Sequence, residues 1–224
     1  MVFTGILILC IIIYKYGQNG HFGPGGEGVR GSRAAQRYRN IDLSIFALMV
    51  ILFESVVVLA ARKWFPGQPF TVSVVPVVVA IVMIRWGPWA AIHAVIGGAV
   101  FCYMSGGGWK QYLIYCLGNL LSLAALPLVK ALGGEEKVRL DALKTLLYGL
   151  CVMLLMWAGR FLLSLVLGIG AASAAGFFAT DVVSLLFTLV ILWIVRRLDG
   201  VFEDQYHYLL RLRAEQEEER GGYR

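Results

Sequence analysis

The sequence lacks the motifs that mark nucleotide hydrolysis, zinc-dependent proteolysis and ester cleavage. It has no G-x-x-x-x-G-K-[ST] loop to hold ATP phosphates, no H-E-x-x-H helix and no G-x-S-x-G nucleophile turn. No group of Asp, Glu, His and Cys residues has the spacing of metal ligands. We therefore predict that the chain is not an enzyme and that it uses no cofactor.

Charged residues and cysteines are also sparse. Only 15% of the 224 residues are charged and 59% are hydrophobic, a composition too apolar for one soluble domain. The cysteines, Cys10, Cys102, Cys116 and Cys151, lie in separate apolar stretches without a C-x-x-C pair. They indicate small buried side chains rather than disulfides or a metal site. The net charge of +6 is scattered between apolar stretches, so we expect no nucleic-acid partner.

Long apolar stretches dominate instead, and they predict an all-α, polytopic membrane helix bundle. A span needs about 20 apolar residues, and these stretches lack the alternation of a β-barrel. Six transmembrane helices are expected at residues 42–62, 71–86, 88–104, 111–130, 142–168 and 176–197. Three regions follow: a short apolar segment and a Gly-rich basic linker at 1–40, a six-helix membrane domain at 41–198, and a charged tail at 199–224. Residues 2–14 leave open a seventh, short N-terminal helix.

Lysine and arginine positions predict the orientation in the cell membrane, because basic loops stay on the cytoplasmic side. With residue 41 inside, only Arg62, Lys63 and Lys110 flank the spans on the outside. The basic flanking residues inside are then Arg30, Arg33, Arg37, Arg39, Arg85, Lys130, Lys137, Arg139, Lys144, Arg196 and Arg197. We therefore expect a multi-pass protein with a cytoplasmic C-terminus.

Glu54, Asn119, Arg160 and Asp181 are polar side chains inside apolar spans. At about 1.5 Å per helical residue, all of them fall in the outer half of the bilayer. A charge in hydrocarbon costs about 2.5–3.5 kcal/mol on insertion scales, so it usually faces a partner or a cavity. Two interpretations stay open: a structural ion pair between Arg160 and Asp181, or a substrate-binding pocket that opens outward.

The other two members of this polar layer have alternatives of their own. Glu54 is either a second partner of Arg160 or a protonated side chain in apolar surroundings. The amide of Asn119 suits a ligand's heterocycle, and it equally suits a hydrogen bond between helices.

Two tryptophans, Trp64 and Trp109, lie in Gly-rich outer loops. Each is expected to anchor its loop at the membrane interface or, as a substrate-binding residue, to stack on a planar ligand. Ala90, Ala94 and Gly98 repeat every four residues on the third span, and such a stripe lets another helix approach closely. That helix belongs either to the same chain or to a partner subunit. His93 on the same span is expected to be a packing residue.

The order of features between residues 42 and 197 resembles the substrate-binding S-components of energy-coupling factor (ECF) vitamin transporters. A first helix at 42–62 precedes an outer loop, and a short second helix at 71–86 turns at Gly87-Pro88. The third span that follows is rich in Gly and Ala, with the sequence WAAIHAVIGGAVFCYM, and three more helices complete the pattern.

The resemblance implies a six-helix bundle that binds a vitamin or similar small nutrient on its external side. Helices four to six supply most of such a site, and Asn119, Arg160 and Asp181 fall on them. The partners implied are an ECF transmembrane coupling subunit and an ATPase pair, besides the lipid bilayer. The first span lacks the A-x-x-x-A contact motif of many family members, because Ala47 is followed four residues on by Ile51. A shared and a dedicated coupling module therefore both stay open.

Two other functions compete with transport. A non-catalytic scaffold membrane protein, MreD-like, would use the polar layer for helix packing and the cytoplasmic tail for interactions. An intramembrane enzyme would use Glu54 or Asp181 as an acid or base, but no motif supports it.

Overall fold

The computed structural model describes residues 33–67 and 70–221, and every regular element in these ranges is helical. The helices are α3 (Arg33–Trp64), α4 (Val75–Trp86), η1 (Gly87–Trp89), α5 (Ala90–Ser105), α6 (Trp109–Gly118), η2 (Asn119–Ala125), α7 (Leu126–Ala131), α8 (Glu135–Leu140), α9 (Ala142–Val166), α10 (Ala171–Thr180), α11 (Val182–Val195) and α12 (Gln205–Gly221). The predicted all-α fold is confirmed for this part of the chain. The predicted N-terminal helix and most of its linker lie outside the described residues.

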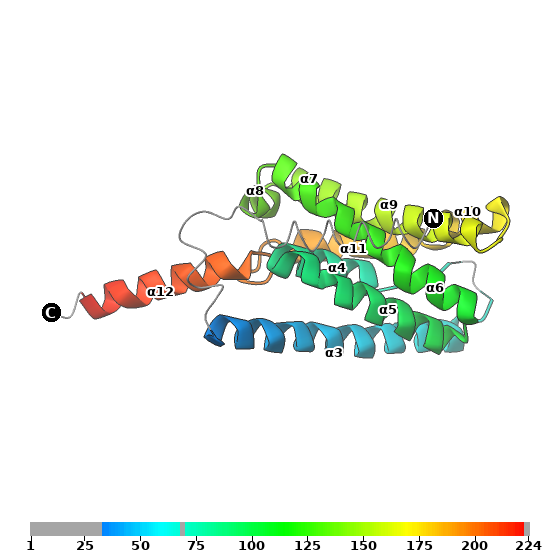
Figure 1. Cartoon of the computed structure of the whole chain (residues 1–224), viewed down its shortest axis with the longest axis horizontal. Coiled ribbons are helices and arrows are strands. Elements are labelled where there is room, and N and C mark those ends of the chain that lie inside the picture. Colours follow the sequence, from blue (N-terminus) through cyan, green and yellow to red (C-terminus); the bar gives the residue numbers. More distant parts are fainter. Residues whose placement is uncertain (1–32, 68–69, 222–224) are drawn as a thin grey trace.

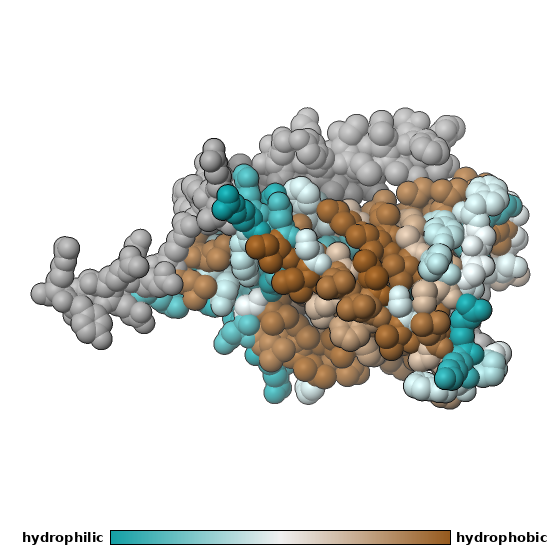
Figure 2. Space-filling model, turned by 90° about the horizontal axis from the view of Figure 1, so that it is seen from below, coloured by the Kyte–Doolittle hydropathy of each residue, from teal (hydrophilic) through white to brown (hydrophobic). Residues whose placement is uncertain are grey.

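Five stretches in the described ranges are long and apolar enough to cross a membrane. They are Ala35–Trp64, Val75–Ser105, Trp109–Ala131, Ala142–Val166 and Ala171–Val195. On the face shown in Figure 2, apolar residues form a broad band, and hydrophilic residues border it toward the two ends. On α3 the side chains of Leu48, Leu52 and Val56 are 56%, 55% and 61% exposed. Such a surface suits hydrocarbon, whereas water would penalise it by about 25 cal/mol per Å².

At the centre of the bundle, α4 and α5 form an antiparallel hairpin (Figure 1). Gly87, with a φ of 60°, ends α4, and Pro88 lies in the 3-10 turn that reverses the chain. The two helices touch closely, because a Cβ on Gly97 would lie 2.5 Å from the side chain of Val75. All 12 residues of α4 are buried. This helix is therefore enclosed by protein and not by lipid.

The second helix is shorter than predicted from the sequence. Residues 71–74, expected to be helical, are not, and the 12 residues of α4 reach only about 18 Å. That is shorter than the roughly 30 Å hydrocarbon core of a bilayer. The apolar stretch Val75–Ser105 is this hairpin, which is why six predicted helices correspond to five long stretches.

Two further predicted spans are interrupted. The span predicted at 111–130 consists of α6, η2 and α7, and the span predicted at 176–197 consists of α10 and α11 with Asp181 between them. The latter also begins earlier than predicted, at Ala171. The glycines in its Gly/Ala-rich start led to the prediction of a loop there. Alanine, however, is the strongest helix former. By contrast, α9 at Ala142–Val166 matches its predicted span closely.

A polar cluster around Arg85 closes the end of the bundle from which α12 extends (Figure 1). The Arg85 guanidinium group donates to both carboxylate oxygens of Asp42, at 2.9 and 2.6 Å. It also donates to the backbone carbonyl of Gly200, and Trp86 Nε1 donates to Asp42 at 2.5 Å. The cluster thus joins α3, α4 and the chain that follows α11. We refer to this end as the α12 end and to the opposite one as the loop end.

Candidate functional site

Three breaks in regular α-helix meet in the described part of the bundle. Residues 70–74 are non-helical before α4, η2 begins at Asn119, and Asp181 separates α10 from α11. The Thr71 N–H donates to the Thr180 carbonyl at 2.8 Å, which holds the first break beside the third. Irregular backbone at membrane depth is stable only inside protein or along a cavity, and broken helices form the binding sites of many transporters.

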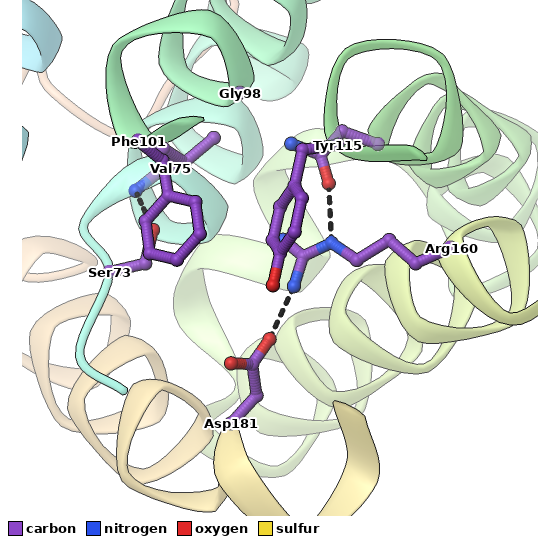
Figure 3. A pocket seen from close by; sticks show the side chains of 8 residues that line it. Ser73, Val75, Gly98, Phe101, Tyr115, Arg160 and Asp181 are labelled. Atoms are coloured by element: carbon purple, nitrogen blue, oxygen red, sulfur yellow. Dashed lines mark hydrogen bonds and ion pairs between the residues drawn. The ribbon is translucent and has the colours of Figure 1, made fainter. Parts of the chain in front are cut away.

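Arg160 of α9 connects these breaks (Figure 3). Its Nε donates to Asn119 Oδ1 at 2.8 Å, and its guanidinium group forms an ion pair with Asp181. The guanidinium carbon lies 4.6 Å from the centre of the Tyr115 ring, a cation–π contact. Arg160 is only 2% exposed and Asp181 3% exposed. Because burial of an unpaired charge is very costly, each member of this pair depends on the other.

Asp181 also binds the non-helical segment. Its second carboxylate oxygen accepts a hydrogen bond from the Thr71 hydroxyl. The Ser184 hydroxyl on α11 donates to the Thr71 carbonyl at 3.1 Å and accepts from the Ser73 N–H at 3.0 Å. Side chains of α11 and of the break before it therefore replace the backbone hydrogen bonds that residues 70–74 would make in a helix.

Glu54 of α3 binds the end of the same segment. It is completely buried, and its Oε2 accepts a hydrogen bond from the Val74 N–H at 2.8 Å. Its Oε1 has no hydrogen-bond partner among the described residues. Within these residues no ion pair joins Glu54 to Arg160, so Glu54 binds the start of α4 rather than the arginine.

Two glycines allow Arg160 and Asn119 to meet. A Cβ on Gly118 would lie 2.8 Å from the Arg160 backbone nitrogen, and a Cβ on Gly159 would collide with the Gly118 carbonyl oxygen. The backbones of α9 and the α6–η2 junction therefore touch directly. Any larger side chain at either position would separate the arginine from the amide that it binds.

The described residues enclose a very small cavity beside this network and a larger one at the loop end. The small cavity measures about 10 Å³ and is lined by Ser73, Tyr115, Arg160 and other residues drawn in Figure 3. That volume holds about one water molecule. The larger cavity measures about 380 Å³, and its lining includes Thr71 and Phe101. Phe101 lines both cavities, and Thr71 binds Asp181, so the larger cavity adjoins the Arg160 network.

Trp64 and Trp109 do not belong to this arrangement. They are 69% and 66% exposed, and neither lines either cavity. Lys110 lies 5.9 Å from the Trp109 ring. The exposure of both rings at the loop end suits interfacial anchoring.

The small-residue stripe packs within the chain. Ala90 and Ala94 are fully buried, and a Cβ on Gly98 would lie 2.8 Å from the backbone of Tyr115 on α6. Gly98 is therefore covered by α6, and the buried Ala90 and Ala94 offer no surface to a partner subunit. Next to it, His93 is also fully buried, with Nε2 2.9 Å from the Leu43 carbonyl oxygen. It packs α5 against α3.

Thr71, Ser73, Tyr115 and Ser184 were missed by the sequence analysis as members of the site. A hydroxyl group in an apolar span is weak evidence for a binding site, because it can donate a hydrogen bond to a backbone carbonyl in the preceding turn of its own helix. The Thr188 hydroxyl does so, to the Ser184 carbonyl at 2.7 Å. Across the part of the chain that the structure describes, no three His, Cys, Asp or Glu side chains are placed to hold one metal ion.

Fold and site together define a multi-pass membrane helix bundle with a charged network buried among broken helices. No protein-family model matches the chain, and neither a curated protein nor a solved structure shows significant similarity to it.

Proposed function

We propose that the protein is the substrate-binding subunit of an ECF-type uptake transporter for a vitamin or similar small nutrient. It is non-catalytic and is energised by a separate transmembrane coupling subunit and an ATPase pair. It lies in the cell membrane with its C-terminus in the cytoplasm. The observation that supports this most is the convergence of three helix breaks on the buried Arg160–Asp181 pair.

A purely structural ion pair does not require broken helices. Each break leaves backbone groups unsatisfied, and side chains such as Thr71 and Ser184 must compensate them. Transporters use this device because half-helix ends and unwound backbone bind polar ligand groups. Asp181 and Asn119 orient the guanidinium group of Arg160, and a polar group of the ligand can accept a hydrogen bond from its remaining N–H donors.

The route to this network starts at the loop end. The cavity beside Arg160 holds about one water molecule, so a nutrient must reach the network from the 380 Å³ cavity, which shares Phe101 with it. Small-molecule sites commonly measure about 300–1,000 Å³. Binding at the loop end, followed by rearrangement of the Thr71–Asp181 contact, is the sequence of events that we propose.

A thermal-shift screen tests the proposal. Purified protein is heated with a panel of vitamins, nucleobases and cofactor precursors. A ligand at one hundred times its Kd stabilises the fold by about 2.7 kcal/mol. We expect at least one hit, and we expect Asp181→Asn to abolish its shift.

The matched control is Asp42→Asn, because Asp42 also belongs to an Arg–Asp pair, at the α12 end. It should destabilise the protein yet keep the ligand-induced shift. Equal shifts in the wild type and Asp181→Asn would show that the site is wrongly assigned. A hit should also accumulate in cells only when the ATPase pair is active.

A scaffold function is the second candidate, and one observation favours it. The polar groups of Arg160 and Asp181 are already bound within the chain, and α12 extends beyond the bundle as an accessible helix. If the panel gives no hit and removal of α12 abolishes co-purification of other membrane proteins, the scaffold is the better description.

A further inference from the structure

The loop-end cavity carries chemical information about its ligand. It lies between the end of α3, the residues on both sides of positions 68 and 69, and the end of α5. Its walls include the rings of Phe65, Phe70 and Phe101. Aromatic walls favour planar ligands, since offset or edge-to-face ring pairs add about 0.5–1.5 kcal/mol to the burial of apolar area.

Arg62 is the one ionisable side chain among the described lining residues. One of its terminal nitrogens donates to the Met104 carbonyl at 2.6 Å, a bond that fixes the side chain across the gap between α3 and α5. A guanidinium group has five N–H donors, so this bond leaves others for a ligand. No carboxylate lines the cavity in the described part, so its electrostatic preference is for an anion.

We propose that this cavity binds a planar aromatic anion, with the ring among the phenylalanines and the carboxylate on Arg62. The inference rests on the proposed function, because it names the ligand class of that subunit. Thr71 lines the same cavity and holds Asp181. A ring that displaces the Thr71 hydroxyl therefore disturbs the Arg160 network directly.

The chain offers a closely matched control for the role of Arg62. Lys63, the next residue, is also basic and exposed at the end of α3, but it does not line the cavity. Replacement of either residue by glutamine removes one positive charge from the same region of the surface. Only Arg62→Gln removes a charge from the cavity wall.

The test uses 2-naphthoate and its neutral analogue 2-naphthamide as probes. The full chain is placed in phosphatidylcholine nanodiscs, and binding is measured by equilibrium dialysis. We expect the wild type to bind naphthoate about tenfold more tightly than naphthamide, as a charge-assisted bidentate contact predicts. Arg62→Gln should remove this preference, and Lys63→Gln should keep it. Phe101→Leu should weaken the binding of both probes.

Several outcomes would overturn the inference. Equal affinities for the two probes, or equal losses in Arg62→Gln and Lys63→Gln, would show that the cavity does not select the anion. Loss of naphthoate binding in phosphatidylglycerol nanodiscs would assign the cavity to an anionic lipid headgroup. Thermal unfolding of each variant checks that it is folded, and we expect the exposed Arg62 to tolerate replacement.

Different experimental results would reject the inference and the proposed function. A nutrient hit in the thermal-shift panel that is unaffected by Arg62→Gln keeps the proposed function and overturns the inference. Arg62-dependent naphthoate binding with no nutrient hit and no ATPase-dependent uptake keeps the inference and rejects the transporter.

Discussion

Gly118 and Gly159 face each other across the junction of α6–η2 with α9, with no room for a side chain between them. A Cβ on Gly159 would collide with the Gly118 carbonyl oxygen, and a Cβ on Gly118 would lie 2.8 Å from the backbone nitrogen of Arg160. The distance between the two backbones thus sets the geometry of the buried charge.

Gly159→Ala should therefore destabilise the protein by about 1–3 kcal/mol, the usual cost of overpacking. It should also weaken the bond between Arg160 and Asn119. Thermal unfolding in nanodiscs measures the effect. Gly176→Ala is the control, because Gly176 lies inside α10 and a Cβ added there would meet no atom within 4 Å beyond its chain neighbours and the nearby backbone of its own helix. It should be neutral or stabilising by up to about 1 kcal/mol.

The ion pair of Arg160 and Asp181 should show strong coupling in a double-mutant cycle. Asp181→Leu alone leaves a buried guanidinium group without its counter-charge, which costs about 3–5 kcal/mol. Arg160→Met combined with Asp181→Leu removes both charges and should be more stable than Asp181→Leu alone. Denaturant unfolding of the four proteins gives the coupling energy. A double variant that is as unstable as the sum of the two single variants would contradict the pairing.

At the α12 end, Asp42→Asn should also be strongly destabilising. Asp42 accepts hydrogen bonds from Arg85 and Trp86, and Arg85 is 6% exposed. We expect a loss of about 3–5 kcal/mol and faster proteolysis of the chain after α11. Asp199→Asn is the comparison, because Asp199 is 88% exposed in its pair with Arg139. Its loss should be about 0–1 kcal/mol.

Trp64→Ala and Trp109→Ala should leave ligand affinity unchanged, because neither ring lines either of the two cavities described above. Phe101→Ala should reduce it, since Phe101 lines both cavities. Affinity for a hit from the nutrient panel, measured for the three variants, checks this directly. A large loss in Trp109→Ala would restore the idea of a tryptophan lid over the site.

Sequence reasoning located the charged centre because a charge in an apolar span is conspicuous. Glu54, Asn119, Arg160 and Asp181 are all buried, and helical depth alone brought them to a common layer. The depth of a residue along its helix does not say toward which neighbouring helix its side chain points. Glu54 therefore binds Val74, and Arg160 binds Asn119 and Asp181.

The helix breaks were only partly predictable from the local pattern. Pro76 in the first turn of α4 fits a helix that starts at Val75, but contacts to Glu54, Thr180 and Ser184 are what satisfy the non-helical backbone before it. In the apolar run around Asn119, Pro127 follows the end of η2, but Gly118 alone does not mark where this 3-10 segment begins. Tertiary contacts therefore contribute to both breaks.

The dependence of residues 70–74 on α10 and α11 also has a consequence for biogenesis. Thr71 and Ser73 are made early in synthesis, yet their hydrogen-bond partners Thr180, Asp181 and Ser184 follow more than 100 residues later, with separations of 109–113 positions. Until the last span has entered the membrane, the backbone groups of Thr71 and Ser73 lack these partners, although Glu54 is already present to bind the Val74 N–H. The first half of the bundle therefore reaches its final position in the membrane only after the second half has been inserted.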